Sequence, residues 1–518
     1  MAIKLKSATN DGFVVDIIEV EVDILKGMPS FTIVGLPDTA VKESKERVKS
    51  AIINSGYEFP LGKIVINLAP ADIRKVGSVL DLPIALGILM ESNQIKRRDL
   101  EDYIIFGELS LNAEIKPVKA ALLFILKGVD EDIDNIILPY DNIRECMYCS
   151  KAKYYPFISL NECVSYINFN DRLPSKINEY EQDENDEDLY DFSNIIGQET
   201  SKRAIMIAAA GNHNIILYGS TGVGKSMLAK ALPSILPKLS MEEELEIVKI
   251  YSATGLLGDK RISRPFRSPH HTITYSGLVG GGKNIKPGEI TLAHKGVLYL
   301  DEILEFKKNV LEGLREPLEE GKIEICRNNN SISLPSDFIF IAATNLCPCG
   351  KYDLNNNNGC NCNLSEINRY VSKMSKALRD RIDMFNYVPM VNYNQINNKE
   401  RMPESKKMKE EVIRAREKQK ERLKYTKYMY NSQIKGKDIF ELCRINKKVE
   451  IILSQYFVNS KPSLRSYGKV VKVARTIADI EGLNDIDESC ILEALEYRKD
   501  IDGKVIWWII NYGFQWLI

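Results

Sequence analysis

The chain has 518 residues, of which 44% are hydrophobic, so it can bury large cores and is expected to contain about two to four domains. Its 70 Lys and Arg residues balance 71 Asp and Glu residues, and the net charge of −1 excludes a protein that coats nucleic acid over its whole surface. Any nucleic-acid contact must therefore be local. No apolar run approaches the ~20 residues of a membrane span, and the first residues lack the apolar core of a signal peptide. The ten cysteines suit thiols or metal ligands in a reducing cytoplasm, so we expect a cytoplasmic protein without membrane contact.

Residues 1–172 predict an α+β domain. Strands are expected in two apolar stretches, at 12–24 and 63–70. Residues 38–56 predict a helix that is capped by Asp38 and stopped by Gly56, because Val41, Ser44, Val48 and Ile52 recur at helical spacing. Further helices are expected over 80–92 and 120–128, and a hairpin over 103–115.

Residues 173–191 are acidic and poor in apolar residues, which is typical of a solvated linker. An α/β core is expected at 192–392, and mostly helical sequence at 393–503 suits a lid, with 404–427 as a solvated charged helix. The last residues, 504–518, form an apolar tail that holds all three tryptophans. The tail is too short to span a bilayer, so we expect it to dock on the lid or on a neighbouring subunit.

Residues 214–226, NIILYGSTGVGKS, combine an apolar strand, a glycine-rich turn and the start of a helix. The glycines let backbone N–H groups point at phosphate oxygens, and the helix adds the positive end of its dipole. In this pattern the lysine contacts the outer phosphates and the last serine ligates Mg²⁺. The sequence therefore predicts that ATP binds to Gly219, Ser220, Thr221, Gly222, Val223, Gly224, Lys225 and Ser226.

Two more apolar runs end in polar residues. GVLYLDE, at 296–302, ends in Asp301, which would hold Mg²⁺ with Ser226, and in Glu302, which would polarise the attacking water. DFIFIAATN, at 337–345, ends in Asn345, whose amide could orient that water from a strand between the other two. Each of these side chains alone could be a solvated strand end. Together with the phosphate loop they predict a Mg²⁺-dependent ATP hydrolase.

Four cysteines follow the Asn345 strand, and their thiolates could complete a tetrahedral structural zinc site: Cys347, Cys349, Cys360 and Cys362. The polar loop at 351–359 could not pack by itself, which makes a metal staple plausible. A reduced thiol cluster without metal is the alternative. Cys146 and Cys149 also have C-x₂-C spacing, but they lack a second pair and are interpreted as ordinary thiols.

The chain resembles the ComM/YifB family of magnesium-chelatase-like AAA+ ATPases. The matching segments include DFSNIIGQETSKRAIMIAAAGNHNIILYG, RPFRSPHHTIT, GLVGGG, PGEITLAHKGVLYLDEILEF, LREPLEEGKIEICR, AATNLCPCG, LRDRIDMF and SLRSYGKVVKVARTIADIEG, with GLPDTAVKESKERVKSAI and GSVLDLPIALGIL in the first domain. The likeness covers nearly the whole chain except its last dozen residues. It implies an α/β P-loop AAA+ module, with a parallel sheet and helices on both faces, and a helical lid. A Lon-protease-like α+β domain would precede them.

The resemblance further implies a ring, expected to be a hexamer, with ATP between subunits. Asn345 would be the sensor on its strand, Arg381 in LRDRID the arginine finger, and Arg465 in SLRSY the second sensor on the lid. Guanidinium groups suit the negative charge of phosphoryl transfer. Arg379 stands where the family usually has an apolar residue, so it competes with Arg381 as the finger. For either arginine, a surface ion pair is the alternative.

The first domain also resembles the Lon-type protease fold, but its residues do not fit a protease. Val79 occupies the position of the nucleophilic serine, with Ser78 adjacent, and Leu122 lies where the lysine is required, with Lys119 about a helical turn away. Nucleophile and base must lie within hydrogen-bond reach. We therefore expect a scaffold or a module that binds a protein partner, not a protease.

The insertion at 261–295 is long, basic and glycine-rich, and in relatives such an insertion forms a hairpin near the central pore. A ring would concentrate these charges on DNA phosphates without reading sequence. The candidates are Arg261, Arg264, Arg267, Lys283, Lys286 and Lys295. Alternatively, these charges solvate the insertion or line subunit contacts. His270 and His271 are interpreted as structural or intersubunit residues, because neighbours on a strand face opposite ways.

Two functions remain open from the sequence. The first is a DNA motor, since ComM-type relatives are associated with branch migration during uptake and recombination of DNA. The second is a protein-remodelling or chelatase-type ATPase that acts without DNA and recruits a client through the first domain.

Overall fold

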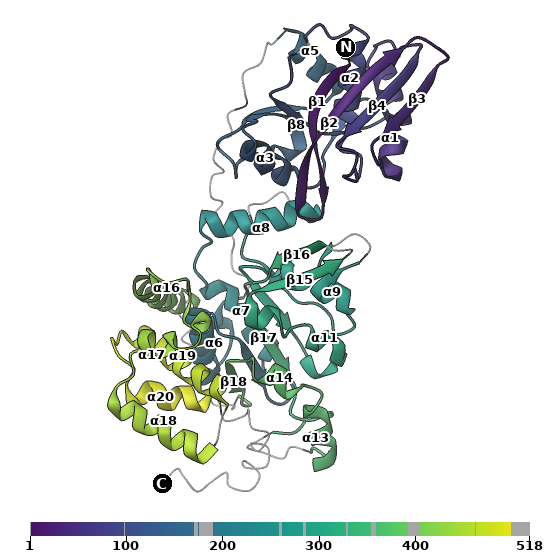
Figure 1. Cartoon of the computed structure of the whole chain (residues 1–518). Coiled ribbons are helices and arrows are strands. Elements are labelled where there is room, and N and C mark those ends of the chain that lie inside the picture. The colour runs from purple at the N-terminus through teal and green to yellow at the C-terminus, as the bar shows by residue number, and fades with distance from the viewer. Residues whose placement is uncertain are drawn as a thin grey trace. The chain divides into compact units, whose positions relative to one another are not determined.

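The computed structural model describes residues 2–97, 99–169, 175, 190–257, 262–282, 286–327, 330–353, 359–391, 404–460 and 463–498. Most of the predicted linker at 173–191 and the whole tail at 504–518 lie outside these residues. The chain divides into two compact units (Figure 1). The first contains Met1–Asp183, Met241–Ile262 and Gly282–Lys286, and the second contains Glu184–Ser240, Ser263–Gly281 and Pro287–Ile518.

A mixed seven-stranded sheet forms the first unit, in the order β3-β4-β2-β1-β5-β8-β9. β2 pairs antiparallel with β1 and β4, whereas β3–β4, β1–β5, β5–β8 and β8–β9 are parallel. The strands are β1 (Ile3–Asp11), β2 (Val14–Leu25), β3 (Ser30–Val34), β4 (Lys63–Ala69), β5 (Tyr103–Ile105), β8 (Asn135–Pro139) and β9 (Lys153–Phe157). The hairpin expected at 103–115 is shorter than predicted: its first residues join the large sheet as β5. Only β6 (Glu108–Leu109) and β7 (Ile115–Lys116) pair as a hairpin.

The first helix begins and ends as its sequence predicts. Asp38 is the N-cap of α1 (Thr39–Asn54), and its carboxylate accepts a hydrogen bond from the backbone N–H of Val41 at 2.8 Å. The helix ends before Gly56, whose φ of +81° is left-handed. The other helices of this unit are α2 (Asp81–Glu91), α3 (Ala121–Asp130), the one-turn η1 (Tyr140–Asn142), α4 (Ile143–Cys146), α5 (Leu160–Phe169) and α8 (Met241–Thr254).

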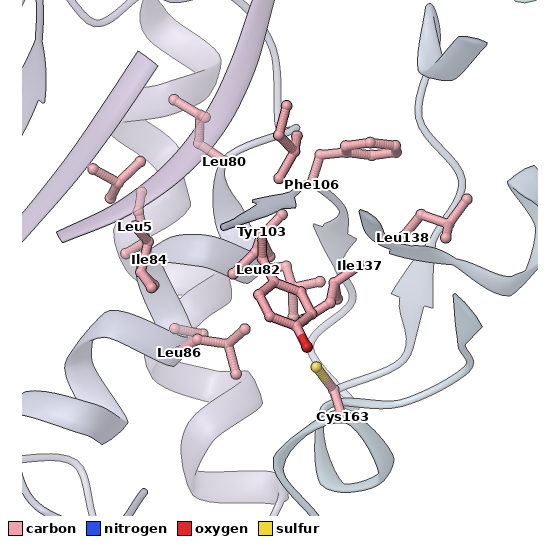
Figure 2. Close-up of a cluster of buried hydrophobic side chains, with 14 of the residues drawn as sticks. Leu5, Leu80, Leu82, Ile84, Leu86, Tyr103, Phe106, Ile137, Leu138 and Cys163 are labelled. Atoms are coloured by element: carbon pink, nitrogen blue, oxygen red, sulfur yellow. The ribbon is translucent and has the colours of Figure 1, made fainter. Parts of the chain in front are cut away.

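α2 is buried along nearly its whole length and anchors the core of the first unit. Leu82, Ile84 and Leu86 of α2 lie with Leu5 and Phe106 in one apolar cluster (Figure 2). The helix approaches the sheet so closely that a Cβ on Gly87 would lie 2.6 Å from the Val22 side chain. Only glycine permits this approach, which explains a poor helix former in the middle of α2.

The helix α8 lies in the first unit, although the sequence places it within the region predicted as the α/β core. Its Ser252 carbonyl accepts the backbone N–H of Ala120 at 2.9 Å, and its Ser252 hydroxyl donates to Glu145. Glu145 is buried and also accepts the N–H of Leu122 at 2.8 Å. A buried carboxylate needs such donors, so these contacts hold α8 against α3 and α4.

Five parallel strands form the sheet of the second unit, in the order β11-β14-β17-β10-β18. They are β10 (Ile215–Tyr218), β11 (Phe266–Arg267), β14 (Val297–Leu300), β17 (Ile339–Thr344) and β18 (Met384–Tyr387). Every residue of β14 and β17 is buried, as their continuous apolar runs predict for a sheet covered on both faces. β17 lies between β14 and β10, as expected from the sequence. The predicted α/β P-loop class is confirmed.

Helices and short strands complete the second unit. Near the sheet are η2 (Phe192–Asn194), α6 (Glu199–Gly211), α7 (Lys225–Ile235), α9 (Tyr275–Val279), β12 (Gly280–Gly281), α10 (Glu289–Leu292), η3 (Ile303–Glu305), α11 (Lys308–Glu312), α12 (Pro317–Glu320), the hairpin β15 (Lys322–Arg327) and β16 (Asn330–Pro335), α13 (Leu364–Val371) and α14 (Lys376–Arg379). A further short strand, β13 (Lys286–Pro287), begins with the last residue assigned to the first unit. The helical region comprises α16 (Glu404–Leu423), η4 (Asn431–Gln433), α17 (Asp438–Cys443), α18 (Lys447–Ser460), α19 (Leu464–Glu481) and α20 (Glu488–Glu496).

α16 is not the fully solvated helix that its charge suggests. One face of it is buried, through Met408, Val412, Ala415, Gln419 and Leu423. This face packs against α6, α7 and α19, beside the other helices of the region (Figure 1). The steps of three and four residues are those of a helix stripe, and long charged side chains cover the opposite side. Within the described part of the chain, no helix combines the length and apolar character needed to cross a bilayer.

Candidate nucleotide site and its surroundings

The turn between β10 and α7 has the backbone that the phosphate-loop motif requires. Gly222 and Gly224 adopt left-handed φ values of +84° and +96°, which other residues rarely adopt. Lys225 opens α7 and is buried. Its Nζ donates to the carbonyl oxygens of Gly219 and Ser220 at 2.9 and 2.7 Å. The ammonium is thus held inside the loop, where phosphate oxygens would accept hydrogen bonds from it.

Burial lowers the pKa of Lys225 to about 8, because the charged form loses its water shell. Asp301 and Glu302 oppose this shift through their negative charge. Most Lys225 side chains are therefore charged at neutral pH, but they lose the charge about one pH unit higher. An anion in the loop would raise the pKa again.

Ser226 and Asp301, the two predicted Mg²⁺ ligands, lie together. The Ser226 hydroxyl donates to Asp301 Oδ2 at 2.9 Å, which joins the start of α7 to the end of β14. Hydroxyl and carboxylate oxygens are hard ligands that suit Mg²⁺, so the residues present fit this ion. Glu302 follows directly and is exposed, with a φ of +47°. Its side chain is therefore open to solvent at the same strand end.

Asn345 lies at the end of β17, between the phosphate loop and the acidic pair. Its Oδ1 accepts a hydrogen bond from Lys225 Nζ at 3.1 Å. The three strand ends therefore bring lysine, serine, aspartate and asparagine to one edge of the sheet. This is the arrangement that the sequence predicts for aligning water and phosphate.

The four cysteines after β17 converge on one point. The Sγ atom of Cys349 lies 3.3 Å from that of Cys347 and 3.6 Å from that of Cys360. With Cys362, all four Sγ atoms lie within 4.8 Å of one another. In the first unit, Cys146 and Cys149 are buried, and burial raises the pKa of the Cys146 thiol.

Arg381 and Arg465 share one carboxylate, which the sequence reasoning did not identify. Glu319 of α12 accepts from both guanidiniums, and its distance to Arg465 Nη2 is 2.8 Å. Arg381 also donates to the backbone carbonyls of Arg315 and Ala377, at 2.9 and 2.8 Å. Glu319 is one of several acids in LREPLEEGKIE, so no spacing or neighbour distinguishes it in the sequence.

Arg379 has different surroundings. It is partly buried, its Nε has no partner among the described residues, and burial lowers its pKa. The structure therefore brings Arg381, and not Arg379, together with Arg465.

Arg381 and Arg465 line a cavity of about 950 Å³ between the α/β core and the helical region. Lys469 and Lys472 line it as well, whereas residues 219–226 do not. Lys469 Nζ lies 2.7 Å from Asp383 Oδ1. Burial lowers the pKa of Lys469 to about 8. Glu319 and Asp383 also line the cavity, so its lining carries both signs of charge, and it is separate from the chain's own phosphate loop.

The basic insertion divides into engaged and exposed residues. Arg264 donates to the carbonyls of Pro237 and Lys295, and Arg267 forms a two-point pair with Glu289 at 2.6 and 2.8 Å. Both guanidiniums are therefore engaged by groups of the same chain, which neither the DNA contact nor its alternatives predicted. Lys286 is exposed, whereas Arg261 and Lys283 lie outside the described residues.

The prediction that His270 and His271 face opposite ways, as neighbours on a strand do, is wrong. Their ring centroids are 4.1 Å apart, because the chain turns at this point and is not a strand.

The surroundings of Ser78 differ from those of a serine–lysine protease. Its hydroxyl donates to the Glu108 carboxylate. Lys119 is exposed, and Leu122 and Val79 are buried. The Ser78 hydroxyl is thus paired with a carboxylate, and the residue at the predicted nucleophile position, Val79, is apolar and buried.

Comparison with known proteins agrees with this geometry. The model for magnesium chelatase, subunit ChlI, matches residues 191–396, and those for subunit ChlI of Mg-chelatase and the ChlI C-terminal region match 20–142 and 402–498. The chain is thus a magnesium-chelatase-like AAA+ ATPase.

Its full-length relatives define the family. The chain is 39% identical over 493 residues to YifB of Salmonella typhimurium, covering 94% of this chain and 95% of the relative. It is 36% identical over 501 residues to the competence protein ComM of Haemophilus influenzae, covering 95% and 96%. It is 38% identical over 503 residues to YifB of Escherichia coli, covering 94% and 95%. The chain belongs to the ComM/YifB family.

Proposed function

We propose that the chain hydrolyses ATP with Mg²⁺ as part of an oligomeric ring. The observation that carries this proposal is the meeting of Lys225, Ser226, Asp301 and Asn345 at the ends of three adjacent parallel strands. The loop N–H groups and Lys225 bind the phosphates, and Ser226 with Asp301 holds Mg²⁺. The ion neutralises charge on the phosphate oxygens when bound. Glu302 takes the proton of the attacking water, and Asn345 orients that water.

The placement of the two paired arginines supports assembly into a ring. Arg381 and Arg465 line a cavity that contains no residue of the chain's own phosphate loop. Phosphoryl transfer gains greatly from a guanidinium on the transferred phosphate. We therefore assign both arginines to the ATP bound by an adjacent subunit, with Arg381 as the finger. A hexamer is the ring size that the family suggests.

DNA is the substrate that we propose for this motor. One relative is named a competence protein, and Lys286 in the insertion is exposed. A ring presents one such residue from each subunit, so a chain of nearly neutral charge can offer a basic channel. Arg264 and Arg267 are left out of this proposal, because contacts within the chain engage them.

The experiment measures ATP hydrolysis by the full chain at low salt, alone and with single-stranded, forked or three-stranded DNA. Branch migration of the three-stranded substrate is followed on a gel, with Glu302→Gln as the inactive control. Stimulation and strand movement that require Glu302 are expected. ATP hydrolysis that ignores every DNA, together with no strand movement, would exclude the DNA motor.

A protein-remodelling ATPase is the second candidate. The engagement of Arg264 and Arg267 inside the chain and the match to chelatase models favour it. The same assay decides between the two, since a remodelling ATPase hydrolyses ATP at a rate that is independent of DNA. Its client would then be recovered bound to the first unit.

A further inference from the structure

The four sulfurs after β17 have the spacing of a single tetrahedral metal ion. Zinc–thiolate bonds of about 2.3 Å place neighbouring sulfurs about 3.8 Å apart at the corners of a tetrahedron. The three Sγ separations among Cys347, Cys349 and Cys360 are 3.3, 3.6 and 3.7 Å. With Cys362, every pair lies within 4.8 Å. All four are free thiols.

Local chemistry also fits a metal. Four thiolates this close repel one another unless a cation lies between them, and soft sulfur ligands select zinc over magnesium or calcium. The backbone N–H of Tyr352 donates to Cys347 Sγ at 3.4 Å, a contact that orients a metal-bound thiolate. The sequence of residues 351–359 is too polar to build a core of its own, which suits a segment that a metal closes.

The same segment touches the phosphate loop. The backbone N–H and the hydroxyl of Thr221 both donate to the Gly350 carbonyl, at 2.8 and 3.2 Å. The Ser220 hydroxyl donates to the buried Asp353 carboxylate at 3.3 Å. Gly350 lies between two of the cysteines, at a φ of +73°, and a Cβ there would lie 2.1 Å from Thr221 Oγ1. Gly350 and Asp353 therefore pack directly on Ser220 and Thr221, which would bind phosphate.

Asn345 ties the two sites together from the other side. It lies two residues before Cys347 and accepts from Lys225 Nζ at 3.1 Å. Residues 345–353 thus contact the phosphate loop at Lys225, Thr221 and Ser220 while carrying two of the four sulfurs.

We infer that Cys347, Cys349, Cys360 and Cys362 bind one Zn²⁺ ion, and that this ion holds residues 347–353 against the phosphate loop so that ATP binds tightly. The thiols release their protons to solvent when the metal binds. This inference rests on the proposed ATP site. The zinc would be a second metal beside the proposed Mg²⁺. It would not touch the nucleotide, but it would fix the shape of the phosphate loop that binds the nucleotide.

The first experiment measures metal. The full chain, purified without added zinc, is expected to contain one zinc per molecule by mass spectrometry of the metals. Cobalt in its place should give the intense visible absorption of tetrahedral thiolate coordination. The double variant Cys360→Ser/Cys362→Ser should lose both signals, while the matched control Cys149→Ser keeps them. A wild-type chain without zinc, or with another metal, would overturn the site.

The second experiment measures the coupling through titration with a fluorescent ATP analogue in excess Mg²⁺. Removing zinc with a zinc-selective chelator should weaken binding about tenfold, the loss expected for two loop hydrogen bonds, and added zinc should restore it. Gly350→Ala should weaken ATP binding by a similar factor, because the new methyl would lie 2.1 Å from Thr221 Oγ1 and must displace that side chain, and its zinc content is measured in parallel. Circular dichroism checks that both samples stay folded.

The outcomes separate the two proposals. If Gly350→Ala and the zinc-free chain bind ATP as the wild type does, the coupling is wrong even where zinc is present. If the zinc-loaded wild type binds no ATP, or Lys225→Ala binds it equally well, the proposed nucleotide site is wrong, and the zinc content stands by itself.

Discussion

The charge of Lys225 makes ATP affinity depend on pH in a direction that can be worked out. Burial lowers the pKa of this lysine to about 8. Phosphate oxygens in the loop would stabilise the ammonium, so its pKa in the ATP complex is higher. Above pH 8 the complex therefore holds more protons than the free chain, and affinity must fall as the pH rises.

The size of this effect follows from the titration curve. With a pKa of about 8, roughly 90% of the free chain carries the ammonium at pH 7 and roughly 10% at pH 9. The apparent association constant should fall by about tenfold across this range, or about 1.4 kcal/mol. Because burial lowers the pKa of Lys225, a phosphate loop that was opened to solvent would no longer make ATP affinity depend on pH in this range.

The assay is a titration with a fluorescent ATP analogue at constant ionic strength and excess Mg²⁺. Lys225→Arg is the matched control, because a guanidinium stays charged throughout and reports any titration of the nucleotide itself. Its affinity is expected to be lower than that of the wild type but flat with pH. A wild-type affinity that is equal at pH 7 and pH 9, or that rises, would refute the argument that burial holds the lysine near its titration point.

Three other changes test separate parts of the chain. Glu302→Gln should still bind ATP but hydrolyse it at least about 100-fold more slowly in a phosphate-release assay, because water activation is lost while the binding groups remain; normal turnover would contradict its role. Arg381→Lys should bind ATP but not hydrolyse it. Mixing it with Lys225→Ala chains, which are also expected to be inactive, should restore part of the ATP hydrolysis. In such a mixed ring, an intact Lys225 of one subunit can face an intact Arg381 of the next. No recovery at any mixing ratio would contradict the action of Arg381 on a neighbouring subunit. Leu86→Ala should destabilise the first unit by about 2–5 kcal/mol in denaturant unfolding, whereas Leu86→Met should cost less than about 1.5 kcal/mol; equal losses would show that Leu86 does not pack as described.

Much of the nucleotide site could be predicted because its residues are tied to local patterns. The glycine turn before Lys225 requires left-handed backbone, and Gly222 and Gly224 supply it. Asp301 and Asn345 each end a continuous apolar run, and parallel strands place their carboxyl ends at one edge. The prediction that Asn345 lies between the other two strands holds because β17 pairs with both.

The features that could not be predicted depend on contacts between distant residues. α8 belongs with the first unit through Ser252 and Glu145, which are 107 positions apart. Glu319 meets Arg465 across 146 positions. The engagement of Arg267 by Glu289 shows the same limit, since a basic residue in a sequence gives no sign of which acid will neutralise it.

The single carboxylate beneath Arg381 and Arg465 has a consequence for how a ring would work. When either guanidinium moves to a neighbour's phosphate, the other loses a like charge beside it and keeps the Glu319 carboxylate to itself. The remaining ion pair is then tighter, so departure of one arginine opposes departure of the other. In a ring, this sharing would let the two arginines reach the adjacent nucleotide one after the other, while each subunit always retains one closed ion pair.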